Sequence, residues 1–179
     1  MSGIINSTGA RSGVIGTTVG TPAGGISDYD EWHSDTDISS PTSDTTITSW
    51  THNTTHGPIG SAMTRSSGIF MFPSTGYWRI TTHARWASTG TGYSRYNLLY
   101  CNWASAIGGP YTYLSFTDAG MASDVTNSYS TSTTSAVLKV TDESTFEVYF
   151  LVNSQSGHTF KGTQVESFPT ATFMKIAGL

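Results

Sequence analysis

The stretch that decides the fold is GIFMFPSTGYWRITTHARW, residues 68–86. Its second half alternates strictly between two kinds of side chain, with Trp78, Ile80, Thr82, Ala84 and Trp86 set against Arg79, Thr81, His83 and Arg85. Such a period of two is typical of a strand that buries one face, because successive side chains of a strand point to opposite sides. The stretch therefore predicts an antiparallel strand that follows a turn at residues 73–76.

The same alternation returns in STFEVYFLVN, residues 144–153, which places Phe146 and Phe150 on one face. A turn at residues 142–144 precedes this stretch, and SAVLKV, residues 135–140, precedes the turn. The simplest interpretation is a hairpin that pairs the two stretches.

Further apolar stretches separated by Gly, Pro, Asn and Ser predict more strands at residues 46–50, 68–72, 94–103, 111–116 and 170–177. No segment of ten or more residues carries a convincing helical stripe. The chain is thus predicted to be all-β with about eight antiparallel strands, in a sandwich or a barrel.

Residues 68–86 also carry a resemblance to a known family. Phe70, Gly76, Trp78 and Ile80 fit the aromatic, glycine, aromatic frame of the trimeric jelly-roll heads related to tumour necrosis factor and the complement globular domain. In that resemblance, residues 68–86 look like the central strand pair, and SFPTATFMKIAGL, residues 167–179, looks like the last strand, which returns to the centre of a sheet. The resemblance covers residues 45–179 and implies a jelly-roll β-sandwich that forms a homotrimer. Its core and trimer packing would then use Phe70, Trp78, Ile80, Trp86, Phe146, Phe150 and Phe173.

The first twenty residues hold a near-repeat of period ten, in which Ile4 and Ile5 correspond to Val14 and Ile15 on either side of Arg11. Short β-branched pairs between glycines can lie extended along another surface but cannot form a core alone. The alternative is an unattached tail. This stretch resembles the N-terminal segments of virion proteins of bacteriophages, particularly marine, cyanophage-type ones. The resemblance implies an anchoring arm over residues 1–20, with Ile4, Ile5, Arg11, Val14 and Ile15 as its contacts.

Residues 21–44 are rich in turn formers and acidic side chains, which predicts a solvated linker between the arm and the jelly roll at residues 45–179. Crowded carboxylates could also hold calcium. However, the spacing of Asp28, Asp30, Glu31, Asp35 and Asp37 matches no EF-hand loop, so a linker without metal is favoured.

Composition excludes several classes of protein. Eight Lys and Arg against twelve Asp and Glu give a net charge of −4 with no basic cluster, which argues against nucleic-acid binding. No apolar run is long enough to span a membrane, and the N-terminus lacks both the basic start and the apolar centre of a signal peptide, so we expect a soluble protein made in the cytoplasm, with no membrane insertion. Cys101 is the single cysteine and lies in an apolar strand pattern, so a small core or interface residue is favoured over a reactive thiol.

Sequence motifs for catalysis are absent. His52 and His56 have the spacing of a helical metal pair, but Gly57 and Pro58 follow at once and further ligands are scattered, so no metal site and no cofactor are expected. No nucleophile elbow, P-loop or dinucleotide fingerprint occurs. We therefore expect a protein that is not an enzyme, and an enzyme acting on host-surface polysaccharide ranks last.

A candidate ligand-binding loop joins Trp103 to Tyr111 and Tyr113, whose rings are of a kind that stacks on sugars. These rings could instead pack in the core or about a three-fold axis. Together these features favour a capsid decoration or cement protein on the virion surface, with the major capsid protein as its partner. The alternative is a receptor-binding head at the tail, with a tail adaptor protein and a host glycan as partners.

Overall fold

The computed structural model describes residues 25–55, 57–88, 94–121, 128–155, 158–162 and 170–179. These residues form strands and no helix, as the sequence predicts. The strands are β1 Tyr29–Ser34, β2 Ile38–Ser39, β3 Thr45–Thr46, β4 Trp50–His52, β5 Thr64–Ser66, β6 Ile69–Met71, β7 Gly76–Ala87, β8 Asn97–Ala104, β9 Thr112–Asp118, β10 Tyr129–Val140, β11 Glu147–Ser154, β12 Thr159–Phe160 and β13 Thr170–Ala177.

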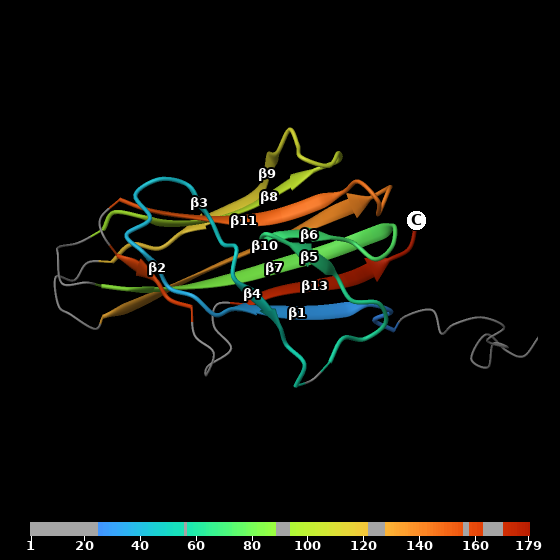
Figure 1. Ribbon diagram of the computed structural model, residues 1–179, viewed down its shortest axis with the longest axis horizontal. Coiled ribbons are helices and arrows are strands. Elements are labelled where there is room, and N and C mark those ends of the chain that lie inside the picture. The colour runs from blue at the N-terminus through green and yellow to red at the C-terminus, as the bar shows by residue number, and fades with distance from the viewer. Residues whose placement is uncertain (1–24, 56, 89–93, 122–127, 156–157, 163–169) are drawn as a thin grey trace, which may run out of the picture.

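Two antiparallel sheets pack face to face as a jelly-roll sandwich, which confirms the predicted fold class (Figure 1). The first sheet has the order β2-β12-β7-β13-β1-β4. Strand β10 also belongs to this sheet and pairs with the edge of β7 opposite to the edge that β12 and β13 share. The second sheet has the order β5-β6-β11-β8-β9, with β3 also paired to β11. The last strand, β13, lies inside the first sheet between β7 and β1, as the resemblance implies.

The core lies between the two sheets and is built mainly from aromatic rings. Phe70 contacts the rings of Trp50, Phe150 and Phe173 at centroid distances of 5.0–5.9 Å. All residues predicted to pack in the core or at a trimer contact are buried within the single chain, and Phe146 is the most exposed of them at 7%. Strand β7 buries the alternating face that the sequence predicts.

Two predicted strand pairings are wrong. Strands β10 and β11 are joined by the expected turn at Asp142, but β10 pairs with β7 and β11 pairs with β8. In the same way, β6 and β7 flank the turn at residues 73–76 but belong to different sheets. Alternation shows which face of a strand is buried. Because strands in both sheets of a sandwich bury their inner faces, the pattern does not show which neighbouring strand a given strand pairs with.

The prediction of a solvated linker over residues 21–44 is also wrong for the part of the chain that forms β1. Strand β1 is inserted between β13 and β4, and β2 pairs with β12. Asp30 in β1 is 1% exposed, so its charge is not solvated as the linker prediction requires. The jelly roll therefore includes β1 and β2, on the N-terminal side of the predicted boundary at residue 45.

Candidate functional site

The outer face of the second sheet carries a group of aromatic side chains. Val148 and Phe150 of β11 point into the core, so the strand's alternation places Glu147 and Tyr149 on the opposite, outer side. Across the sheet, Tyr149 pairs with Asn102, and Asn102 pairs with Tyr113. We call the resulting group the aromatic face; it consists of Tyr100, Tyr111, Tyr113, Phe116 and Tyr149.

The rings of the aromatic face touch one another in two sets. Tyr100 stacks on Tyr113 at 5.2 Å between centroids and lies 6.1 Å from Phe116. Tyr111 meets Tyr149 edge to face at 4.5 Å. Tyr113 and Phe116 are 59% and 63% exposed, which is unusual for large apolar rings that lie together. This face is therefore available for contact with another molecule.

A β-bulge brings Tyr113 and Phe116 to the same side of β9. The register between β8 and β9 shifts between Cys101 and Asn102, so that Tyr113 faces Asn102 while Phe116 faces Tyr100. Leu114 packs against the core instead. A bulge adds one residue to one strand and so changes which side chains share a face.

Glu147 is a buried carboxylate at one end of the aromatic face, and it is only 4% exposed. Its Oε2 accepts hydrogen bonds from the backbone N–H of Gly108 at 2.9 Å and from the hydroxyl of Tyr111 at 2.7 Å. Burial and the bond to Glu147 raise the pKa of Tyr111 to about 12, so this hydroxyl stays protonated and remains a donor at neutral pH. Gly108 has φ +78°, a conformation that favours glycine.

Two adjoining cavities hollow the outer face beside this carboxylate, and Ser67 and Ile69 line both. One has a volume of about 320 Å³ and is also lined by Thr46, Thr48, Tyr111 and Tyr149. The other has a volume of about 400 Å³ and is also lined by Thr64, Arg65, Ser66, Met71 and Glu147. We call the two together the outer groove. Its volume lies in the range of small-molecule sites.

The structure brings two of the three predicted binding residues onto the aromatic face. Tyr111 and Tyr113 lie there, whereas Trp103 packs against the core and stacks on Phe146 at 5.7 Å. Sequence reasoning missed Tyr100, Phe116, Tyr149 and Glu147. Tyr149 and Glu147 occupy the alternate positions to Val148 and Phe150, so the period of two in residues 144–153 was the signal that could have found them.

The acidic residues of β1 and its flanks do not converge on a metal site. The described part of the chain contains no group of three or more His, Cys, Asp or Glu side chains placed to hold a metal ion. Asp30 instead bonds Trp32, His52 and two backbone amides. His56, the other half of the predicted histidine pair, lies outside the described residues.

Cys101 is a core residue, as predicted. It is 1% exposed on the inner side of β8. Burial raises the pKa of its thiol to about 12, so the nucleophilic thiolate is not populated at neutral pH.

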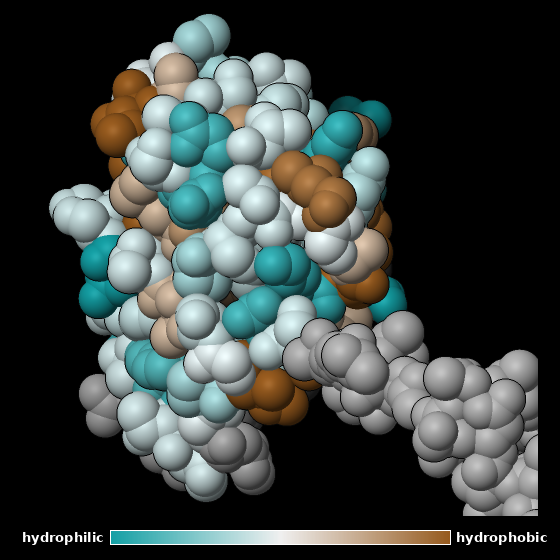
Figure 2. Space-filling model, turned by 90° about the vertical axis from the view of Figure 1, so that its right-hand side faces the viewer, coloured by the Kyte–Doolittle hydropathy of each residue, from teal (hydrophilic) through white to brown (hydrophobic). Residues whose placement is uncertain are grey.

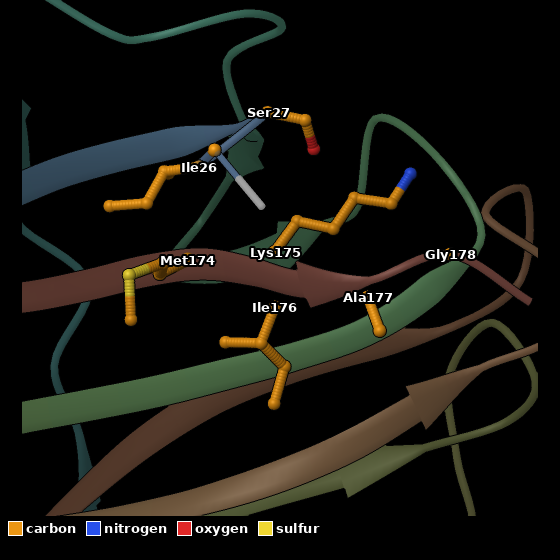
Figure 3. A pocket seen from close by; sticks show the side chains of 8 residues that line it. Ile26, Ser27, Met174, Lys175, Ile176, Ala177 and Gly178 are labelled. Atoms are coloured by element: carbon orange, nitrogen blue, oxygen red, sulfur yellow. The ribbon is translucent and has the colours of Figure 1, made fainter. Parts of the chain in front are cut away.

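A further cavity of about 520 Å³ lies where the described chain begins (Figure 3). Gly25, Ile26 and Ser27 line it from one side, and residues 174–178 of β13 and its end line it from the other. Residues 1–20, with the predicted anchoring contacts Ile4, Ile5, Arg11, Val14 and Ile15, lie outside the described residues.

Among the described residues in view at this end of the sandwich, hydrophobic side chains form no large patch (Figure 2). Figure 2 shows mostly pale, weakly polar residues, with hydrophobic residues gathered in small separate groups. Among the described residues, no helix is long and apolar enough to cross a membrane.

Comparison with known proteins supports the fold. The chain is similar to Eiger TNF from S. frugiperda, with a TM-score of 0.61 and 12% identity over 84% of this chain and 93% of that one. Murine APRIL at pH 8.5 gives a TM-score of 0.59 and 10% identity over 83% and 98% of the two chains. The vertex protein P5 of PRD1 gives 0.51 and 16% identity over 86% and 99%. No protein-family model and no curated protein sequence matches the chain. The likeness establishes a TNF-like jelly roll.

Proposed function

We propose that this chain is a non-enzymatic structural protein of a bacteriophage virion, a homotrimer that decorates the capsid surface. Residues 1–20 would act as the arm that docks each subunit on the major capsid protein. Support comes from a fold shared with a phage vertex protein and from the resemblance of the arm to virion proteins. The low charge of the chain fits a protein that binds other proteins and not nucleic acid.

The observation that carries the proposal of self-association is the exposed edge of the aromatic face. Tyr113 and Phe116 lie on β9, the last strand in the order of the second sheet, and both are more than half exposed. Rings exposed together at a sheet edge favour contact with a second protein surface. In a closed homotrimer each subunit would cover this edge with a surface of its neighbour.

The first experiment measures the mass of the full chain in solution by light scattering after gel filtration. We expect three times the mass of one chain, and a smaller species for Phe116→Ser because a polar side chain removes apolar contact area. Val137→Ser on the outer side of β10 is the control, since Val137 is 51% exposed but belongs to the other sheet. A monomer at micromolar concentration contradicts the proposed trimer.

The second experiment tests the arm. Deletion of residues 2–20 is expected to leave the oligomer folded and to abolish incorporation into particles, because the buried core that the structure describes is built from residues between Ile47 and Phe173 and the arm is proposed to act in docking. Truncated protein that still purifies with virions would exclude the anchoring role.

A receptor-binding head at the tail is the second candidate function. Tyr111 and Tyr113 favour it, because these residues of the predicted binding loop lie on the outer face. Quantitative mass spectrometry of purified particles distinguishes a capsid decoration protein from a receptor-binding head. A copy number equal to that of the major capsid protein, or a simple fraction of it, supports decoration of the shell. A copy number of a few per cent or less supports a tail component bound to an adaptor protein.

A further inference from the structure

The outer groove contains a buried carboxylate whose hydrogen bonding is incomplete. Both hydrogen bonds that the described residues give Glu147 go to Oε2. Within the described chain no donor bonds Oε1, and no Lys, Arg or His forms an ion pair with this carboxylate. Glu147 as a whole is only 4% exposed, but its unbonded Oε1 keeps contact with solvent in the groove that Glu147 lines. A ligand in the groove could therefore donate a hydrogen bond to Oε1 in place of water, and the low exposure of the carboxylate would strengthen that bond.

The walls of the groove determine which donor fits. The ring of Tyr149, with Tyr111 against it, forms an apolar surface next to Ile69. Around this surface stand the hydroxyl groups of Thr46, Thr48, Ser66 and Ser67. The groove therefore combines one aromatic surface, one strong acceptor and a rim of hydroxyl groups.

We propose that the outer groove is a binding site for a neutral saccharide. A pyranose ring has an apolar face of C–H groups that packs on an aromatic ring, and its hydroxyls project from the edge as donors and acceptors. One hydroxyl would donate to Oε1 of Glu147 while the C–H face covers Tyr149, and the rim hydroxyls would bond the rest. The two cavities, of about 320 and 400 Å³, provide room for more than one sugar unit.

Other ligands fit the groove less well. A divalent cation needs several oxygen ligands, and Glu147 is the only carboxylate among the residues that line the two cavities. An acidic sugar would meet the negative charge of Glu147, whereas the guanidinium of Arg65, which also lines the groove, donates to the carbonyl of Thr48 at 3.1 Å and lies over the ring of Trp32. The inference concerns ligand chemistry, so it stands whether the protein sits on the capsid or on the tail, and it does not depend on the proposed trimer.

The test applies the full chain to an array of neutral and acidic oligosaccharides, followed by calorimetric titration with the neutral oligosaccharide that binds best. Glu147→Gln is expected to weaken binding about 10-fold or more, because it removes a charge-assisted hydrogen bond. Glu143→Gln, an exposed glutamate in the turn before β11, is the matched control and should bind as the unmodified chain does.

A second variant keeps the test informative if Glu147→Gln fails to fold. Tyr149→Leu should also weaken binding about 10-fold, whereas Tyr77→Leu on the outer side of β7 should not. Lack of binding to every neutral oligosaccharide at about 10 mM overturns the proposal. Preference for acidic saccharides, or undiminished binding in both groove variants, overturns it equally.

Discussion

The carboxylate of Asp30 lies 2.5 Å from Nε2 of His52, although 22 residues separate the two in the chain. Its Oδ2 accepts hydrogen bonds from the indole N–H of Trp32 at 2.9 Å and from the backbone N–H of Met63 at 2.8 Å. His52 also stacks on Trp32, at 4.7 Å between ring centroids. The buried side chain of Asp30 therefore connects β1, β4 and the segment before β5.

Asp30→Asn should therefore destabilise the fold. The amide nitrogen of asparagine cannot accept a hydrogen bond, so at least one buried donor loses its partner. We expect the free energy of unfolding to fall by about 2–4 kcal/mol. Urea denaturation followed by tryptophan fluorescence measures the change. Asp118→Asn, at an exposed position on β9, should change it by less than about 0.5 kcal/mol, and equal effects at the two sites would contradict the structural role of Asp30.

Strand β10 offers a matched pair of valines for testing which face is buried. Val140 is fully buried against the core, and Val137 is 51% exposed. Val140→Ala should lower the free energy of unfolding by about 2 kcal/mol, because it removes two buried methyl groups and leaves a cavity. Val137→Ala should lower it by less than about 0.5 kcal/mol. Thermal or urea unfolding of the two variants side by side decides the point, and a reversed order would mean that β10 is turned over.

The thiol of Cys101 should be inert in the folded protein. Its pKa is raised to about 12 by burial, and the side chain is 1% exposed, so neither thiolate nor access is available. We expect no reaction with Ellman's reagent at pH 8 until urea unfolds the chain. Ser105→Cys, in the exposed loop after β8, should add one thiol that reacts at once. Rapid labelling of the unmodified native chain would show that β8 opens.

His83 should make stability depend on pH in the mildly acidic range. Burial lowers the pKa of His83 below its usual value near 6.5, although the charge of Glu31 opposes this shift. The unfolded chain then binds a proton more readily than the folded chain, so stability is lost as the pH falls below about 6.5. NMR titration of the imidazole should give a midpoint below 6.5, and His83→Gln should reduce the slope of stability against pH. A midpoint above 6.5 would contradict the desolvation of this ring.

Much of the fold could be read from periodicity because burial of one face leaves a direct trace in sequence. Trp78, Ile80 and Trp86 were placed on the inner side of a strand from alternation alone, and the structure buries all of them. Strand β1 was missed because its acidic side chains hide its pattern. Asp30 is buried there only because Trp32, His52 and Met63 satisfy its carboxylate.

The candidate site depends on contacts that no local pattern contains. Glu147 and Tyr111 are 36 residues apart, and they meet because β8 pairs with β11 on one side and with β9, which directly follows Tyr111, on the other. Tyr113 and Phe116 are three residues apart and would lie on opposite faces of a regular strand. The bulge in β9 puts both on the outer side.

The sequence by itself determined the all-β class, the buried face of the long strands and the position of several turns, because each depends on neighbours within a few residues. Tertiary structure alone decided which strands pair, since every strand of a sandwich buries its inner face in the same way whichever sheet it joins. It also decided that a carboxylate remains in the outer groove with one oxygen unbonded. That outcome depends on which distant donors reach Glu147, and the spacing of residues along the chain does not encode it.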